Sequence, residues 1–368
     1  MAKNVKNLVI VILSLIGLCL VAGFVTVYMI VNPATVLSYI TTTIQDKTGY
    51  AVTTQGNASL SLYPFLALSI NEMNLAKPAS AQPSITFKQL TLSSPWQWKW
   101  SKTDHWQTTI HAKELLLDKF KASQVTGKLS INNDAVILEN LTAQCYQGTM
   151  LASAQFDKKS NKGLQWQIDL SKIDMFSTLR DLLGDAPTTI TGLATIHFIG
   201  HMQQLTVNDL FGSLQFNIAS GSIKGIDLNY FIDKGIAVLK QQRNDRTRTD
   251  GTQFQQLSGT VYIADRLAKS DDVILLADAF TARISGEMSL IDKTLDTAIQ
   301  IKPKNTPKLM VPLLVSGPVT KPSVKLDTLL IQTILTKEEL DELKNKVEVE
   351  LKKLPEQTSK ILDAIFGE

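Results

Sequence analysis

The sequence is short of the side chains that carry most protein chemistry. Its 368 residues include two cysteines and four histidines, and lysine plus arginine number 37 against 34 for aspartate plus glutamate. Cys19 lies inside a long apolar run, so Cys145 has no partner with which to form a disulfide framework. A net charge of +3 without basic clustering disfavours nucleic-acid binding.

The sequence also lacks the motifs of common enzyme classes. It has no nucleophile elbow, phosphate-binding loop, dinucleotide fingerprint or Ser-His-Asp order. His197 and His201 have the spacing of two zinc ligands on a helix, but GLATIHFIGH alternates as a strand, where residues four apart lie about 13 Å from each other. We therefore expect a protein that is not an enzyme and that uses no metal or cofactor.

One long apolar run stands near the N-terminus. Leu8 to Val31, LVIVILSLIGLCLVAGFVTVYMIV, carries no charge and is long enough for a helix that spans a bilayer. A cleaved signal peptide would have a shorter apolar region and a small-residue cleavage site, which this run does not offer. Lys3 and Lys6 precede the run, and the next positive residue is Lys47. The positive-inside rule then predicts a cytoplasmic N-terminus, with the bulk of the chain across the membrane.

The region from Tyr50 to Asp327 alternates apolar and polar residues with a period of two. The stretch FTARISGEMSL, Phe280 to Leu290, shows this pattern throughout its length. Turn-forming residues recur about every 10 to 15 positions, which predicts many short antiparallel strands. The predicted helices are too few to cover so many strands. Either the sheet curls over itself, or something other than protein covers its apolar face.

Three helical segments flank or interrupt the predicted sheet. A first helix begins at Asn32-Pro33 and ends at Gly49. A second, MFSTLRDLLG, is capped by Asp174. A third begins at the capping box Thr336-Lys337-Glu338-Glu339 and should either cap the open end of the sheet or serve as a docking element. Its apolar stripe consists of Leu340, Leu343, Val347, Leu351 and Leu354.

These patterns divide the chain into three parts and leave three smaller features with two readings each. The parts are a cytoplasmic tip with the anchor (1–31), a β-rich domain (32–327) and a helical tail (328–368). The tryptophans of PWQWKW form a core or edge anchor, or an aromatic belt at a membrane or groove mouth. The run KQQRNDRTRTDG is a solvated loop or a contact for anionic headgroups. Asp271-Asp272 is read as a turn and Glu338-Glu339 as a helix N-terminus, rather than as catalytic carboxylate pairs.

Several segments, taken in order, resemble the AsmA family. They are the stretch from Val31 to Pro78, the segment IDLSKIDMFSTLRDLLGDAPTTITGLATIHFIGH, the segment GSLQFNIASGSIKGIDLNYFI, and the closing segments DGTQFQQLSGTVYIAD and LLVSGPVTKPSVKLD. The resemblance implies a protein anchored in the inner membrane of a Gram-negative bacterium, periplasmic in its bulk and mainly β. It further implies an elongated, curled antiparallel sheet whose apolar groove carries phospholipid in support of the outer membrane.

The resemblance gives the alternating strands a function. Acyl chains would lie along the apolar face that includes Phe280, Ala282, Ile284, Met288, Leu290, Leu295, Ile299 and Ile301. In the alternative structure, this face packs against a second sheet in a sandwich. In the alternative function, the protein is a scaffold that recruits an outer-membrane protein assembly factor without binding lipid. At about 4.8 Å per strand, a sheet of this size would reach on the order of 100 Å, so the chain alone should not bridge two membranes.

Overall fold

The computed structural model describes most of the predicted β-rich domain. It covers residues 51–327 apart from 62, 64, 77–84, 95–104, 133, 158–162, 204–206, 240–242, 244–245 and 307–308, together with 332–333 and isolated helical positions between 33 and 45. The predicted anchor Leu8–Val31, the PWQWKW tryptophans and the C-terminal stripe lie outside the described residues. Within the described part, no helix is long and apolar enough to cross a membrane.

The described chain is mainly antiparallel strand. The first nine strands are β1 (Ala51–Gln55), β2 (Ser59–Ser61), β3 (Leu66–Ala76), β4 (Ile85–Ser94), β5 (His105–Leu117), β6 (Phe120–Asn132), β7 (Ala135–Cys145), β8 (Gly148–Asp157) and β9 (Leu164–Asp174). The remaining strands are β10 (Thr189–Met202), β11 (Leu210–Lys224), β12 (Gly251–Ala264), β13 (Leu267–Leu276), β14 (Phe280–Ser289), β15 (Thr294–Pro303), β16 (Leu309–Pro318), β17 (Ser323–Leu326) and β18 (Gln332–Thr333). Two helices, α3 (Met175–Leu183) and α4 (Leu228–Leu239), and the short 3-10 turn Val207–Asp209 interrupt them.

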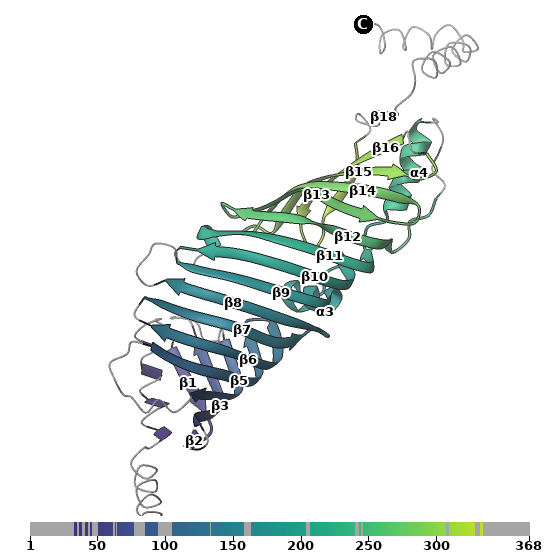
Figure 1. Ribbon diagram of the computed structural model, residues 1–368. Coiled ribbons are helices and arrows are strands. Elements are labelled where there is room, and N and C mark those ends of the chain that lie inside the picture. The colour runs from purple at the N-terminus through teal and green to yellow at the C-terminus, as the bar shows by residue number, and fades with distance from the viewer. Residues whose placement is uncertain are drawn as a thin grey trace, which may run out of the picture.

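The strands form one long meander in which sequence neighbours are spatial neighbours. From β3 to β16 each strand pairs with the next. At one end β1 and β2 both pair with β3, and at the other end β17 and β18 both pair with β16. Among the described strands no pairing joins the two ends, so the sheet stays open and extends along one axis (Figure 1). This confirms the predicted elongated antiparallel sheet. Among the described strands, no second sheet packs against the first to make a sandwich.

The alternation of apolar and polar residues is broken once in many strands, which corrects the expectation of an uninterrupted period of two. In each break, two residues rather than one separate consecutive inward-facing side chains, as Lys88 and Gln89 separate Phe87 from Leu90. The second residue of the pair adopts a positive φ, between 48° and 57° at Gln89, Gln124, Asn140, Lys172 and Ser220. All five are exposed and none is β-branched, which suits a left-handed backbone.

Some of these breaks are β-bulges, and the bulges help to explain why the sheet curls. At Gln89 the ladder keeps its register with both neighbouring strands, so that break is not a bulge. A bulge inserts one unpaired residue, bends the strand and increases its twist. The ladder shifts register accordingly within β6 and β7 and within β9 and β10. Because the bulges recur in strand after strand, the bends add up along the sheet, and the inner face becomes concave.

Asp271-Asp272 lies at another such break and not in a turn as predicted. Both residues belong to β13, at the register shift between Ser270 and Val273. The Asp272 carboxylate accepts a hydrogen bond from the backbone N–H of Thr260 at 2.8 Å. That bond satisfies a ladder donor on β12, and it holds the pKa of Asp272 below its ordinary value.

Helix α3 follows the sequence prediction closely. Asp174 is the N-cap, its carboxylate accepts a hydrogen bond from the Ser177 N–H at 2.9 Å, and Gly184 with φ 84° ends the helix. The helix lies beside the ends of β9 and β10, at one long edge of the sheet (Figure 1).

Helix α4 was missed, because only one helix was expected between the strands. Asp227 caps it, accepting from the Tyr230 N–H at 3.0 Å, and also binds the N–H and the hydroxyl of Thr249 at 2.8 Å each. Its residues Leu228, Phe231 and Ile232 are all at most 6% exposed. The helix covers the inner face of the last strands near one end of the sheet (Figure 1).

Because Asp227 caps α4, the packing of α4 on the sheet should become less stable at acidic pH. Burial alone would raise the pKa of Asp227, but the hydrogen bonds from Thr249 and Tyr230 outweigh it and lower the pKa. A lowered pKa stabilises the fold above about pH 4, and that contribution disappears as the pH falls through the folded-state pKa. We expect Asp227→Asn to lower the free energy of unfolding at pH 7 by about 1–3 kcal/mol and to flatten its acid dependence.

Denaturant unfolding at pH 7 and at several acidic pH values checks this prediction. Asp265→Asn, in the exposed turn between β12 and β13, is the matched control and should stay within about 0.5 kcal/mol of the parent. An unchanged acid dependence in Asp227→Asn would contradict it.

Two clusters of buried side chains line the inner face. The proximal core, from β2 to β9, includes Ile70, Leu90, Val125 and Met150, and the helical residue Leu37 packs against it. The distal core, from β10 to β16, includes the inner residues of α4. The concave face is therefore closed by protein in part, and the part left open defines the candidate site.

Candidate functional site

Strand register aligns the inward-facing residues in rows that cross the sheet. The most buried row, here called the core row, runs from β9 to β16 through consecutive cross-strand pairs. It consists of Ile173, Ala194, Ile218, Leu257, Leu275, Ala282, Ile301 and Val311, each 5% exposed or less. These side chains are packed in the protein interior and leave no room for a ligand.

A second row, here called the lip row, crosses the same face farther along the strands. It consists of Leu129, Leu138, Ala154, Trp166, Gly200, Gly212, Ile263, Ala268, Met288, Leu295 and Gly317, again linked pair by pair from β6 to β16. Every member is apolar or glycine, and all except Ala268 are partly exposed. Six residues, or about 20 Å of strand, separate the two rows on β14.

On the inner face, exposure thus increases from the buried core row to the partly exposed lip row. Isolated exposed apolar residues are ordinary on any protein, as at Ile199 on the outer face, which lies between Gln167 and Ser213. A continuous apolar row is different, because contiguous exposed apolar surface marks a site of contact. The opposite face holds cross-strand ion pairs such as Lys88–Glu114 at 2.8 Å and Lys269–Glu287 at 2.9 Å, and between its polar residues lie single exposed apolar side chains such as Tyr262.

The eight residues predicted to line a groove divide between these environments. Phe280, Ala282, Ile299 and Ile301 lie in the distal core, at 0–7% exposure. Met288 and Leu295 pair with each other in the lip row, and Ile284 is half-buried beside the core. Leu290 lies in the turn after β14, whose last residue is Ser289, and is half-buried. Contact of any of them with lipid stays a prediction.

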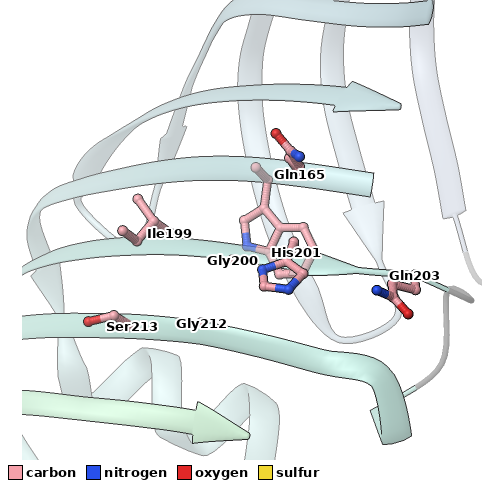
Figure 2. A pocket seen from close by; sticks show the side chains of 8 residues that line it. Gln165, Ile199, Gly200, His201, Gln203, Gly212 and Ser213 are labelled. Atoms are coloured by element: carbon pink, nitrogen blue, oxygen red, sulfur yellow. The ribbon is translucent and has the colours of Figure 1, made fainter. Parts of the chain in front are cut away.

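A hollow of about 710 Å³ lies where β9, β10 and β11 end beside the lip row (Figure 2). Sequence analysis missed it, because it depends on the cross-strand pairing of Gly200 with Gly212 and of Gly200 with Trp166, which alternation alone does not give. Its lining consists of Gln165, Trp166, Ile199, Gly200, His201, Gln203, Gly212 and Ser213. The size is that of a small-molecule site, and the lining combines one large aromatic surface with a few polar groups.

Trp166 is held at this hollow by its neighbours. Its ring packs edge-to-face against Phe198, with centroids 5.8 Å apart. A Cβ on Gly200 would lie 2.6 Å from Trp166 Cζ2, so glycine is needed for the indole to lie across the strand. His201 stacks on Phe211 with centroids 5.3 Å apart. Trp166 and Phe198 thus lie on the inner face, whereas His201 and Phe211 lie on the outer face with Ile199.

The other predicted sites have structural roles where they are described. His197 and His201 lie on the strand β10, as expected, and His197 Nδ1 lies 2.6 Å from Asp169 Oδ1 on β9. Hydrogen bonds from His197 and Gln167 lower the pKa of Asp169. Cys145 is buried and free, and burial raises the pKa of its thiol. In the described part of the chain, no three His, Cys, Asp or Glu side chains come together as metal ligands.

The loop KQQRNDRTRTDG is tied to α4 where it is described. Arg246 forms an ion pair with Asp233 at 2.7 Å, and Arg248 stacks over the rings of Tyr230 and Phe231 at 4.5 and 5.4 Å. The described residues of the loop are exposed, as predicted. Two of its arginines are thus engaged in holding the helix.

Comparison with known proteins gives one result. The profile of the AsmA family matches residues 88–273, from β4 through both helices to β13. No curated protein and no solved structure matches the chain. Two of the segments that resemble the family lie outside the matched residues, namely Val31–Pro78 and LLVSGPVTKPSVKLD. Because the match covers just over half of the 368 residues and includes the bulged meander and the hollow, the chain belongs to the AsmA family.

Proposed function

We propose that this protein is a non-enzymatic, membrane-anchored component of the bacterial envelope that holds phospholipid acyl chains along its lip row. Membership in the AsmA family is consistent with an envelope location and a lipid-related role. The observation that carries the proposal is the continuous apolar lip row, partly exposed at every member except Ala268, beside a buried core row. Acyl chains laid on this row would remove its apolar surface from water, at roughly 25 cal/mol per Å² buried.

Protein covers the inner face near both ends of the sheet, which supports the holding of lipid rather than its free passage along the sheet. Helix α4 occupies the inner face of β12 to β16 at one end of the sheet, and Leu37 packs on the inner face near the other. The accessible apolar edge lies between them. Lipid would therefore enter sideways over the lip row.

Site-specific photocross-linking in intact cells tests this function on the full chain. A photoreactive amino acid at Met288 or Leu295 should form covalent adducts with phospholipid labelled with radioactive phosphate. Placed at Glu287 or Asp296, the outward-facing neighbours on the same strands, it should give none. Equal labelling on both faces, or none at Met288, would refute the proposal. Adducts with protein alone would favour a scaffold instead.

A further inference from the structure

Helix α3 is amphipathic, yet it buries none of its apolar side chains. Its apolar face consists of Met175, Phe176, Leu179, Leu182 and Leu183. Phe176 is 37% and Leu182 44% exposed, and of the five only Met175 packs against a core cluster. Helix α4, on the same sheet, buries Leu228, Phe231 and Ile232. A surface helix is normally stabilised by burying its apolar face, so the open face of α3 requires a partner.

Two cations lie beside this open face. The guanidinium of Arg180 is 5.7 Å and the ammonium of Lys224 is 5.1 Å from the centroid of the Phe176 ring. In the described part of the structure Lys224 has no carboxylate within ion-pair distance. Like charges around one exposed ring repel each other, and an anion placed between them would relieve that repulsion.

One carboxylate, that of Asp181, lies within ion-pair distance of Arg180 and offsets part of this charge. Asp181 approaches Arg180 Nε at 3.8 Å, which is too long for a hydrogen bond, and it also lies 3.5 Å from the Nζ of Lys121. Asp174 is engaged by the Ser177 N–H as the helix cap. Arg180 and Lys224 therefore remain able to bind an external anion.

We infer that α3, Arg180 and Lys224 form a headgroup site for an anionic phospholipid. The phosphate binds Arg180 and Lys224, and the glycerol end of the acyl chains covers Phe176, Leu182 and their apolar neighbours. A guanidinium and an ammonium suit a phosphate, whereas an open apolar helix face suits hydrocarbon; an anionic amphiphile satisfies both. The helix packs against β10 near the strand ends opposite the lip row, with the core row between them, so this site is separate from the lip row. This inference rests on the proposed function and adds the headgroup class.

The test uses the full chain in cells whose phospholipids carry radioactive phosphate. A photoreactive amino acid at the exposed position Leu182 should yield lipid adducts, and mass spectrometry of the adducts should show more anionic headgroups than at Met288. The double variant Arg180→Gln/Lys224→Gln should reduce labelling at Leu182 by about tenfold, because two charge-assisted contacts are lost. Labelling at Met288 should fall much less.

The control removes the same charge elsewhere. Lys302→Gln/Lys325→Gln changes two exposed lysines of β15 and β17 and should leave labelling at Leu182 unchanged. Adducts at Met288 but none at Leu182 would overturn the headgroup site and leave the proposed function standing. Absence at both positions would refute both. Protein adducts at Leu182, or equal headgroup composition at the two positions, would likewise refute the site.

Discussion

Aspartate at position 301 should unfold the distal half of the sheet, whereas aspartate at position 288 should leave it folded. Ile301 is fully buried in the core row, and an unpaired carboxylate there would lose its water without gaining a partner. We expect Ile301→Asp to cost on the order of 3–5 kcal/mol of unfolding free energy. Met288 is partly exposed in the lip row, so Met288→Asp can keep its charge hydrated.

The two variants together separate folding from ligand binding. Denaturant unfolding should show the large loss for Ile301→Asp and a change below about 1 kcal/mol for Met288→Asp. The latter should nevertheless lose phospholipid labelling at Leu295, its cross-strand neighbour. Unfolding of Met288→Asp to the same extent as Ile301→Asp would show that the lip row is core, and the basis for the lipid proposal would be gone.

A disulfide between α4 and β16 should form without strain and stabilise the protein strongly. A Cβ built on Gly235 lies 3.7 Å from the Cβ of Val311, close to the average separation of about 3.8 Å in disulfides. Gly235→Cys/Val311→Cys would close a long loop that contains β12 to β15. We expect the oxidised double variant to gain about 2–4 kcal/mol over its reduced form.

Comparison of the oxidised and reduced forms of the same double variant supplies the measurement and its control. The single variant Gly235→Ala should be slightly destabilised, because its Cβ would come within 3.1 Å of both Val311 methyls. Failure of the double variant to form the disulfide would mean that α4 does not pack against β16 at this position. The native Cys145 is buried in the proximal core and should stay reduced.

The local elements were predictable where short-range signals agree. The alternation in FTARISGEMSL predicts a strand, and β14 spans all but its last residue. Asp174 and Gly184 predict the two ends of α3. Both signals depend on backbone geometry within a few residues, namely the two-residue repeat of a strand and the orphan donors and acceptors of a helix.

Helix α4 and the bulges were not predicted from the sequence, because their local signals are weak or ambiguous. In IDLNYFIDKGIAVL, Gly235 lowers the helix propensity, and the preceding glycine-rich strand masks the cap. The glycine is tolerated because it lets the helix approach Val311. In the sequence the bulges are pairs of polar residues, such as Glu139-Asn140 and Ser171-Lys172, and such pairs also occur in ordinary turns.

The sequence by itself determined that the chain alternates, that its strands are short and antiparallel, and that an apolar face must find cover. Which apolar residues are covered by protein was decided by the tertiary structure alone. Phe280 and Met288 belong to the same alternation on the same strand, yet one is fully buried in the distal core and the other stays partly exposed. Alternation fixes only the face on which a side chain lies. Its depth depends on strand register, on bulges that bend the sheet, and on where α4 packs, all of which bring together residues far apart in the chain.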